Sequence, residues 1–368
     1  MEKSNYWLIL LAFLVYGCGE NIVDDPKSEL LENETYFPPK NSEKWETLLP
    51  ESLGWSLTEL EELYHFHEEN GTRAFLIIKK GKIIVEKYWG KDIRDEDAFN
   101  QDKPWYWASA SKTLVALTTG IAQEQGYLDI NDQTSQYLGQ GWTSLTSDKE
   151  SLITIKHQLT MTTGLDSSVP DLDCTVPECL HYGVDAGDSW FYHNAPYTLL
   201  NDVIANASNI NFDDYVKVNI ADQIGMNGFW LPIGHNRMYN STARDAGRLG
   251  LLLENNGVWA NKKIISDEDF LKDMLNSSQE LNPSYGYLTW LNGKSSVALP
   301  ERTNSFNTSF APEAPVDLFA AMGKNGQFID VVPSQDLVVI RMGEAPDNSL
   351  VPVLFHNEMW GFISKIVK

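Results

Sequence analysis

The sequence predicts an α/β protein of the α+β type, in which one antiparallel sheet is built from both ends of the chain and flanked by helices. Two observations support this prediction. Short apolar runs separated by turn residues occupy about 73–90 and about 286–342, whereas apolar residues in the long middle, about 110–280, recur mostly at helical spacing. Because antiparallel strands pair through short connections, we expect the two ends to share one sheet and the middle to form a large, mostly helical insertion.

The first elements predicted are a helix and a hairpin. Leucines and aromatic residues recur every three or four positions over 56–69, and Ser56 with Glu59 forms a capping box at the start. Apolar runs at 74–78 and 83–88 then flank Lys79-Lys80-Gly81-Lys82. This arrangement is typical of a β-hairpin with a glycine in its turn.

The remaining elements complete the helical middle and return the chain to the sheet. Helical periodicity with capping or glycine signals predicts the helices, and short apolar runs between turn residues predict the strands. The predicted helices are 109–126, a short one within 153–164, 197–207, 212–223, 243–255, 267–275 and 351–366; the predicted strands are 286–291, 318–322, 328–332 and 337–342.

Composition limits the functions that this chain can have. It has 368 residues, 42% of them hydrophobic, which is ample for one large domain or two intimately joined domains. The formal net charge is −23. Nucleic acid is therefore not an expected partner, because phosphate contacts require a basic surface.

The N-terminus has the pattern of an export signal. Lys3 precedes an apolar run over 7–16, too short to span a bilayer comfortably, and the run ends just before Cys18. This pattern resembles a bacterial lipoprotein signal, in which the cysteine becomes the lipidated first residue of the mature chain. It implies a signal peptide at 1–17 and a lipid-anchored protein of the bacterial cell envelope, on the periplasmic or outer-membrane face. A plain secretory signal or an N-terminal anchor helix is the alternative.

Behind the signal, the chain divides into a tether and one domain. Residues 18–45 are rich in Asp and Glu and are expected to form an acidic tether, followed by the folded domain at 46–368. No other stretch is long and apolar enough to span a bilayer, so we expect contact with a membrane only through the N-terminal lipid anchor.

Two further cysteines, Cys174 and Cys179, stand close together in the middle of the chain. An exported compartment is oxidising, so a local disulfide that closes this loop is the expected state. A metal site is the alternative, but only His181 stands nearby at ligand spacing. With no other ligand cluster in the sequence, we expect neither a metal nor an organic cofactor.

The pattern Ser-x-x-Lys occurs once, at Ser109 and Lys112, directly after an aromatic run at 105–107. Side chains three apart share one face of a helix, so the Lys112 amine lies beside the Ser109 hydroxyl if a helix begins there. A hydroxyl is a weak nucleophile until a base takes its proton, and an amine held neutral by burial can do so. The alternative is a helix start with a capping serine and a solvated lysine. Ser111 would point to a different face and is discounted.

Two more patterns follow in order along the chain. Tyr192-x-Asn194 occurs once, and Lys324-Asn325-Gly326-Gln327 precedes a predicted strand. Ser-x-x-Lys, Tyr-x-Asn and Lys-x-Gly in this order resemble the penicillin-recognising serine hydrolases, in particular their class C β-lactamase-like branch, which also contains D,D-peptidases, esterases and nylon-oligomer hydrolases. The resemblance covers roughly residues 50–365 and implies a β-lactamase/D,D-peptidase-like fold.

The resemblance also implies a role for each of these residues. Ser109 attacks the acyl carbon and becomes acylated. Tyr192 is the expected general base, although burial could instead make the Lys112 amine the base, and the pair could titrate as a unit. Asn194 orients Lys112 and a substrate carbonyl, and the backbone N–H groups of Ser109 and Gln327 form the oxyanion hole. Gly326 lets the substrate lie against the strand edge, and Lys324 with Asn325 stands where the family holds a substrate carboxylate.

One position departs from the family pattern, because β-lactamases and D,D-peptidases carry Thr or Ser where this chain has Asn325. We therefore expect an exported serine hydrolase that cleaves a small-molecule ester, amide or peptide through a Ser109 acyl-enzyme and turns over β-lactams poorly. The alternatives are a true β-lactamase or D,D-carboxypeptidase that acts on cell-wall peptides, and a penicillin-binding sensor module with little turnover.

Overall fold

The computed structural model describes residues 34–300 and 304–367. The expected signal peptide, the lipidation site Cys18 and most of the acidic tether lie outside these residues. Among the helices of the described part, none is long and apolar enough to cross a membrane.

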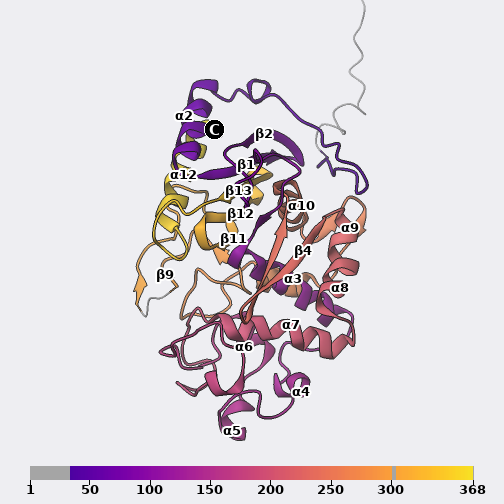
Figure 1. Ribbon diagram of the computed structural model, residues 1–368, viewed down its shortest axis with the longest axis vertical. Coiled ribbons are helices and arrows are strands. Elements are labelled where there is room, and N and C mark those ends of the chain that lie inside the picture. Colours follow the sequence, from indigo (N-terminus) through magenta and orange to yellow (C-terminus); the bar gives the residue numbers. More distant parts are fainter. Residues whose placement is uncertain (1–33, 301–303, 368) are drawn as a thin grey trace, which may run out of the picture. The chain divides into compact units, whose positions relative to one another are not determined.

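A six-stranded antiparallel sheet joins the two ends of the chain, as the sequence predicted (Figure 1). The strand order is β2-β1-β13-β12-β11-β8. The central pair β1–β13 joins the two ends, with Phe75 opposite Arg341 and Lys79 opposite Leu337. The six strands are β1 (Thr72–Lys79), β2 (Lys82–Tyr88), β8 (Trp290–Leu291), β11 (Phe319–Gly323), β12 (Gln327–Val332) and β13 (Leu337–Gly343).

The hairpin β1–β2 turns at the predicted glycine. Lys80 and Gly81 have φ angles of 48° and 76°, the left-handed pair that a two-residue hairpin turn requires. A Cβ at Gly81 would lie 1.7 Å from the carbonyl oxygen of Tyr36. Glycine is therefore needed both for the turn and for the N-terminal segment that crosses it.

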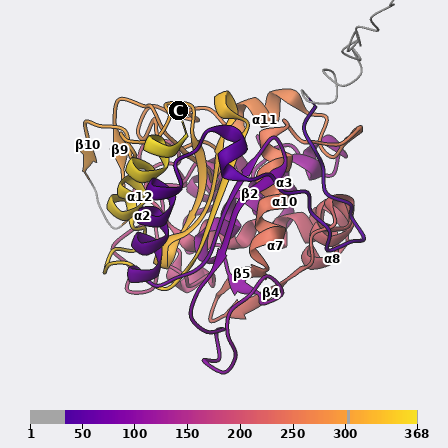
Figure 2. The same cartoon turned by 90° about the horizontal axis from the view of Figure 1, so that it is seen from above.

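Helices cover both faces of the sheet, with α2 and α12 on one side and α10 on the other (Figure 2). α2 (Leu57–Glu69) and α12 (Val353–Ile366) pack through Phe66 and Phe355, whose rings stack with centroids 5.0 Å apart. α10 (Ala243–Glu254) lies so close to the sheet that a Cβ at Gly250 would be 2.4 Å from Val338 of β13. A large part of the core therefore lies between this sheet and the helices on its two faces, and the core continues into the helical middle of the chain.

The helical middle follows the prediction in outline. The helix predicted over 212–223 is one continuous run, but a π-helical turn at Lys217–Ala221 (η4) separates its two α-helical parts. The helices of this region are α3 (Ser111–Glu124), α4 (Ser135–Leu138), α5 (Ser147–Glu150), α6 (Ile155–Leu159), α7 (Asn194–Ser208), α8 (Phe212–Val216), α9 (Asp222–Ile224) and α11 (Glu268–Met274).

The sequence did not predict a second sheet, which has the order β3-β5-β4. It comprises β3 (Trp105–Tyr106), β4 (Gly228–Ile233) and β5 (Asn236–Ser241). Polar residues and Pro232 interrupt the alternating pattern expected of a strand in this region. The partner strand β3 also lies more than a hundred positions earlier in the chain. The other short elements are η1 (Pro50–Leu53), η3 (Pro177–Cys179), β6 (Val258–Trp259), β7 (Lys262–Lys263), β9 (Val297–Ala298), β10 (Ser305–Phe306) and η6 (Pro333–Gln335).

The strand predicted over 286–291 was wrong in its first part, since only Trp290–Leu291 joins the sheet. Leu288 has a left-handed φ of 50°, and its N–H donates to the carbonyl of Leu159 instead of to a neighbouring strand. A contact with a distant loop therefore overrides the local strand preference here.

The compact unit begins at Thr35, not at residue 46 as predicted. Trp45 is buried, and its indole N–H donates to the carbonyl of Gly81 at 2.7 Å. Arg248 of α10 donates to the carbonyl oxygens of Pro38 and Pro39. These contacts attach residues 35–45 to the domain, so this segment, with its one acidic residue Glu43, is not part of a free tether.

Candidate active site

The Ser109 turn joins the second sheet to α3. Ser109 lies in a single 3-10 turn, Ala108–Ala110 (η2), directly before α3. β5 fixes the turn on both sides: the Trp107 N–H donates to the Tyr239 carbonyl, and the Tyr239 N–H donates to the Ser111 hydroxyl. Ser111 is thus a buried structural residue, whereas Ser109 is partly exposed. The geometry presents one serine of the pair to incoming substrate.

Lys112 lies directly behind Ser109. Its Nζ is 2.8 Å from the Ser109 Oγ and 2.8 Å from the Asn194 Oδ1, and the side chain is 1% exposed. The same nitrogen lies 3.9 Å from the ring centroid of Tyr197 and 4.6 Å from that of Tyr192. Burial lowers the pKa of Lys112 well below its usual value, although the negative charge of Asp173 opposes this shift. The environment therefore favours a neutral amine.

Tyr192 lies beside Ser109 and Lys112, and its pKa is shifted in the opposite direction to that of Lys112. It is 4% exposed and packs against the rings of Tyr285 and Trp290. Burial raises the pKa of its phenol, and a hydrogen bond with the Ser109 side chain offsets only part of this rise. The phenol is therefore neutral at ordinary pH. The sequence left open whether Tyr192 or Lys112 is the base. The lowered pKa of Lys112 and the raised pKa of Tyr192 both favour Lys112.

A polar network that the sequence did not reveal surrounds Asn194. The Asn194 Nδ2 donates to the Asp173 Oδ1 at 2.7 Å, and the Asn236 Nδ2 reaches the same oxygen at 3.3 Å. The Tyr197 hydroxyl donates to the Asn236 Oδ1 at 2.6 Å. Asp173 lies in the loop before Cys174 and Asn236 lies in the unpredicted strand β5, so no motif spacing could have identified either residue.

The segment Lys324–Gly326 is a tight turn (η5) between β11 and β12. Asn325 and Gly326 have left-handed φ angles of 64° and 75°. The Asn325 side chain donates to the Tyr106 hydroxyl at 2.7 Å, and the Lys324 side chain is exposed. The structure thus places Asn325 at the rim of the site through Tyr106, three residues before Ser109.

Gly323, which the sequence analysis did not single out, packs directly against the Ser109 turn. A Cβ at this position would lie 3.0 Å from the backbone nitrogen of Ser109 and 2.4 Å from the Trp107 carbonyl oxygen. Gln327 is the partner of Gly323 across the hairpin, and its buried side chain bonds both the N–H and the carbonyl of Gly343. The oxyanion role of the Gln327 N–H stays a prediction.

A buried arginine supports this turn from below. The Arg341 guanidinium donates to the carbonyl oxygens of Asn325 at 2.5 Å and Gly326 at 3.0 Å. Its other N–H groups reach the Thr72 hydroxyl and the carbonyls of Asn70 and Glu344. All five guanidinium donors therefore have acceptors, and two of these acceptors belong to the turn beside the nucleophile.

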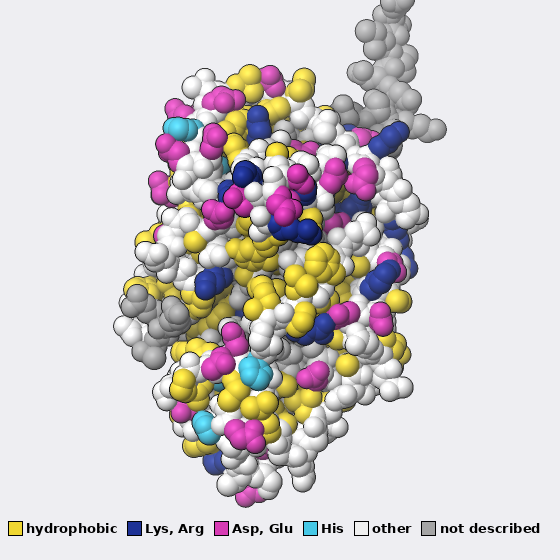
Figure 3. Space-filling model, in the orientation of Figure 1, with side chains coloured by type: hydrophobic (Ala, Val, Ile, Leu, Met, Phe, Trp, Pro, Cys, Tyr) yellow, Lys and Arg dark blue, Asp and Glu magenta, His cyan; other side chains and the backbone are white. Residues whose placement is uncertain are grey.

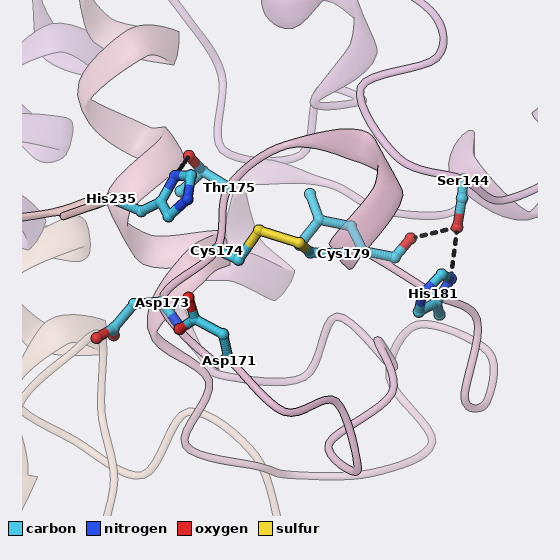
Figure 4. The surroundings of a disulfide bond; sticks show 9 residues. Ser144, Asp171, Asp173, Cys174, Thr175, Cys179, His181 and His235 are labelled. Atoms are coloured by element: carbon cyan, nitrogen blue, oxygen red, sulfur yellow. Dashed lines mark hydrogen bonds between the residues drawn. A yellow bond between two sulfur atoms is a disulfide. The ribbon is translucent and has the colours of Figure 1, made fainter.

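Cys174 and Cys179 form a disulfide in the loop that carries Asp173 (Figure 4). In this view the Asp173 carboxylate points away from the disulfide. The His181 ring is hydrogen-bonded to the Ser144 hydroxyl and lies apart from the sulfur atoms. In the described part of the chain, no group of three or more His, Cys, Asp or Glu side chains is placed to hold a metal ion.

Comparison with known proteins identifies relatives of this arrangement. A family model described as Beta-lactamase matches residues 68–349, more than half of the chain. An uncharacterized protein from Alkalihalophilus pseudofirmus is 22% identical over 302 residues, which cover 74% of this chain and 83% of that protein.

Solved structures share the fold at low sequence identity. A predicted 6-aminohexanoate-dimer hydrolase from Bacillus anthracis has a TM-score of 0.66 at 17% identity, covering 90% of both chains. A penicillin-binding protein homolog from Caulobacter crescentus has a TM-score of 0.63 at 12% identity, covering 83% of this chain and 97% of that one. A family VIII carboxylesterase has a TM-score of 0.60 at 14% identity, covering 82% and 96%.

Proposed function

The chain belongs to the beta-lactamase family of serine hydrolases, and from this premise we propose that Ser109 cleaves a small-molecule ester or amide through a covalent acyl-enzyme. The observation that carries the proposal is the buried Lys112 amine, 2.8 Å from the Ser109 hydroxyl and with its pKa lowered by burial. A neutral amine at this distance accepts the hydroxyl proton as the oxygen attacks.

The reaction then balances in two steps. In the first, the Ser109 Oγ bonds to the acyl carbon, the bond to the leaving alcohol or amine breaks, and the proton taken by Lys112 returns to the leaving group. In this proposal the neutral Tyr192 phenol, which is hydrogen-bonded to the Ser109 side chain, relays that proton. In the second, the oxygen of a water molecule bonds to the acyl carbon while Lys112 takes one of its protons. The bond from the acyl carbon to the Ser109 Oγ then breaks, and that proton passes to the Oγ, which releases the acid and the free serine. The backbone N–H groups of Ser109, in the turn before α3, and of Gln327 are the proposed donors to the oxyanion.

An apolar face beside the nucleophile supports a substrate with a hydrocarbon group. Directly opposed residues of antiparallel strands share a face, which groups Phe229, Leu231 and Ile233 of β4 with Asn240, Met238 and Asn236 of β5. Tyr106 of β3 shares this face because it lies opposite Asn240.

This apolar face spans the site from one rim to the other. At one end Asn236 contacts Asp173 and Tyr197, and at the other end Tyr106 contacts Asn325. Phe229, Leu231 and Ile233 are nevertheless 48%, 42% and 52% exposed. Hydrophobic side chains gather in the middle of the surface in Figure 3, where β4 lies in Figure 1. We infer that an alkyl or aryl group of the substrate covers them.

Two features favour an ester or amide over a β-lactam. Asn325 occupies a left-handed turn and uses its amide on Tyr106, and the Lys324 side chain is exposed. Neither arrangement supplies a buried pair of donors for a substrate carboxylate. The lack of such a donor pair, together with Asn325 in place of Thr or Ser, supports slow β-lactam turnover.

The test compares p-nitrophenyl butyrate with nitrocefin for wild type, Ser109→Ala and the exposed control Ser147→Ala. We expect ester turnover in wild type and in Ser147→Ala, its loss in Ser109→Ala, and a transient acyl adduct on Ser109 in intact-mass spectra. Ester turnover that survives Ser109→Ala would overturn the assignment of the nucleophile. Fast nitrocefin hydrolysis with negligible esterase activity would overturn the substrate class in favour of a β-lactamase.

We also propose that the protein is exported and held in the cell envelope by lipid on Cys18. The charged start, the short apolar run and the cysteine that follows it support this proposal. Metabolic labelling with a fatty-acid probe should mark wild type but not Cys18→Ser. Equal labelling of both, or none of either, would contradict lipidation at Cys18.

A further inference from the structure

We propose that Asp173 is a positioning residue for Lys112, acting through the side-chain amide of Asn194, and that the adjacent disulfide holds Asp173 in place. The proposal deepens the proposed function, because it assigns the group that prepares the base for catalysis. Asp173 belongs to no motif that the sequence analysis identified, and it lies 61 positions after Lys112 and 21 before Asn194.

The two ends of the Asn194 amide have different hydrogen-bonding roles. Its Nδ2 can only donate and its Oδ1 can only accept a hydrogen bond. A carboxylate only accepts, so Asp173 at 2.7 Å fixes the Nδ2 toward itself. The Oδ1 must then face Lys112, where it lies 2.8 Å from the Nζ. The amide orientation is therefore set by the chemistry of Asp173.

A reversed amide would block the base. With the Nδ2 toward Lys112, an amide N–H would donate into the lone pair of the neutral amine, which is the lone pair that must take the proton from Ser109. With the Oδ1 toward Lys112, the oxygen accepts an amine N–H, and the lone pair stays available to the Ser109 hydroxyl at 2.8 Å. Asp173 thus decides whether Lys112 faces Ser109 as an acceptor.

Asp173 orients a second amide in the same way. The Asn236 Nδ2 lies 3.3 Å from the Asp173 Oδ1, which leaves the Asn236 Oδ1 to accept from the Tyr197 hydroxyl. The Tyr197 ring in turn lies 3.9 Å from the Lys112 Nζ. One carboxylate oxygen therefore aligns two of the groups that enclose the amine.

Asp173 also supplies a nearby negative charge. The other groups around Lys112, which are Ser109, Tyr192, Tyr197 and the Asn194 amide, are neutral, whereas the Asp173 carboxylate raises the pKa of Lys112 against the larger effect of burial. The charges of Asp173 and Asp166 also raise the pKa of His193. Burial has the larger effect and lowers this pKa to about 4, so the His193 ring is neutral at ordinary pH.

The loop is built to keep this carboxylate in place. The Asp171 carboxylate accepts from the Asp173 N–H at 2.9 Å, and the Leu172 carbonyl accepts from the Ala195 N–H at the start of α7. Cys174 follows directly and is tied to Cys179. Figure 4 shows Asp171, Asp173 and the disulfide side by side on this loop.

The experiment compares Asp173→Asn and Asp173→Ala with Glu178→Gln, an exposed carboxylate in the same disulfide loop. The base must be neutral, so turnover rises with pH through the pKa of Lys112. Loss of the Asp173 charge should move this acidic limb of kcat/KM to lower pH by about 1 unit. Asp173→Ala should also lower kcat about 10- to 100-fold, because the amide loses its fixed orientation. Glu178→Gln should leave both the limb and kcat unchanged.

A second measurement does not depend on turnover. The pKa of Lys112 can be followed by carbon NMR of lysine labelled at Cε, with Lys112→Met used to assign the signal. The Lys112 pKa should be lower in Asp173→Asn than in wild type and unchanged in Glu178→Gln.

The outcomes separate this proposal from the proposed function. An unchanged Lys112 pKa in Asp173→Asn, or an equal shift in Glu178→Gln, would overturn the role of Asp173 whatever the substrate is. Turnover that is independent of Ser109, alongside the expected NMR shift, would instead overturn the proposed function and leave the Asp173–Asn194–Lys112 relation standing.

Discussion

Replacing Lys112 by methionine should separate catalysis from stability, because methionine matches the unbranched apolar stem of lysine but lacks the terminal amine that accepts a proton. In wild type the Nζ has polar partners at 2.8 Å in Ser109 and Asn194 and is almost fully buried. Loss of a general base lowers turnover by about 10²- to 10⁴-fold. This corresponds to a barrier higher by about 2.7–5.4 kcal/mol.

The same substitution should leave stability nearly unchanged or higher at neutral pH. Two hydrogen bonds of about 1 kcal/mol each are lost. The desolvation of a buried amine, which is of at least similar size, disappears with them. We therefore expect the free energy of unfolding to stay within about 1 kcal/mol of wild type or to rise.

The difference in unfolding free energy between wild type and Lys112→Met depends on pH. Because burial lowers the folded-state pKa of Lys112, the unfolded chain binds more protons than the folded chain between that pKa and the unfolded value of about 10.4. Wild-type stability therefore gains from Lys112 as pH rises through this window, and the methionine variant does not. Any advantage of the variant should be largest below the folded-state pKa and should shrink toward pH 10.

The assay combines p-nitrophenyl butyrate turnover with urea unfolding, followed by tryptophan fluorescence at pH 7 and at pH 9.5. Lys272→Met, on the exposed face of α11, is the matched control and should change neither quantity. Turnover above a tenth of wild type would refute Lys112 as the base. A loss of more than about 2 kcal/mol that is the same at both pH values would show instead that Lys112 is a structural cation.

Three further predictions follow from the surroundings of the site. Arg341→Met should lower the free energy of unfolding by about 3–5 kcal/mol in urea titrations, because it leaves four buried or partly buried carbonyl groups without their donor. The exposed control Arg94→Met should stay within about 0.5 kcal/mol of wild type, and an equal effect of the two substitutions would contradict this prediction. The double variant Cys174→Ala/Cys179→Ala should lower kcat, while the free energy of unfolding falls by only about 2 kcal/mol because the disulfide closes a short loop. An unchanged kcat would show that the loop keeps its shape without the disulfide. Leu231→Ser should lower kcat/KM about fivefold for p-nitrophenyl octanoate but not for p-nitrophenyl acetate, because about 1 kcal/mol of apolar contact is lost only with the longer acyl chain. Equal effects on both esters would count against the apolar face as a substrate contact. A matching effect of the control Leu354→Ser, an exposed residue of α12, would also count against it.

The parts of the fold that were predictable are those encoded over a few residues. The hairpin β1–β2 turns at Gly81 because a left-handed pair is needed there, and the helix after Ser109 follows from its own periodicity. The strands of the second sheet were missed because their pairing joins Trp105 to Ser241, and neither segment has a strong strand pattern of its own. The strand predicted at 286–289 failed for the related reason that a distant loop holds Leu288 in a turn.

The candidate site divides in the same way. That Ser109 and Lys112 share one face was predictable from their spacing, which matches a helical turn. The order of the three motifs likewise predicted that Tyr192 and Asn194 accompany them. The protonation state of the base, by contrast, depends on tertiary packing. Lys112 is enclosed by Asn194 and Tyr197 of α7 and by Tyr192 just before this helix, and this burial sets the direction of its pKa shift. Tertiary packing also brought Asp173 to Asn194 and Gly323 to the Ser109 turn. Spacing along a chain fixes neighbours within one element, whereas burial and long-range hydrogen bonds depend on every segment that packs around a group.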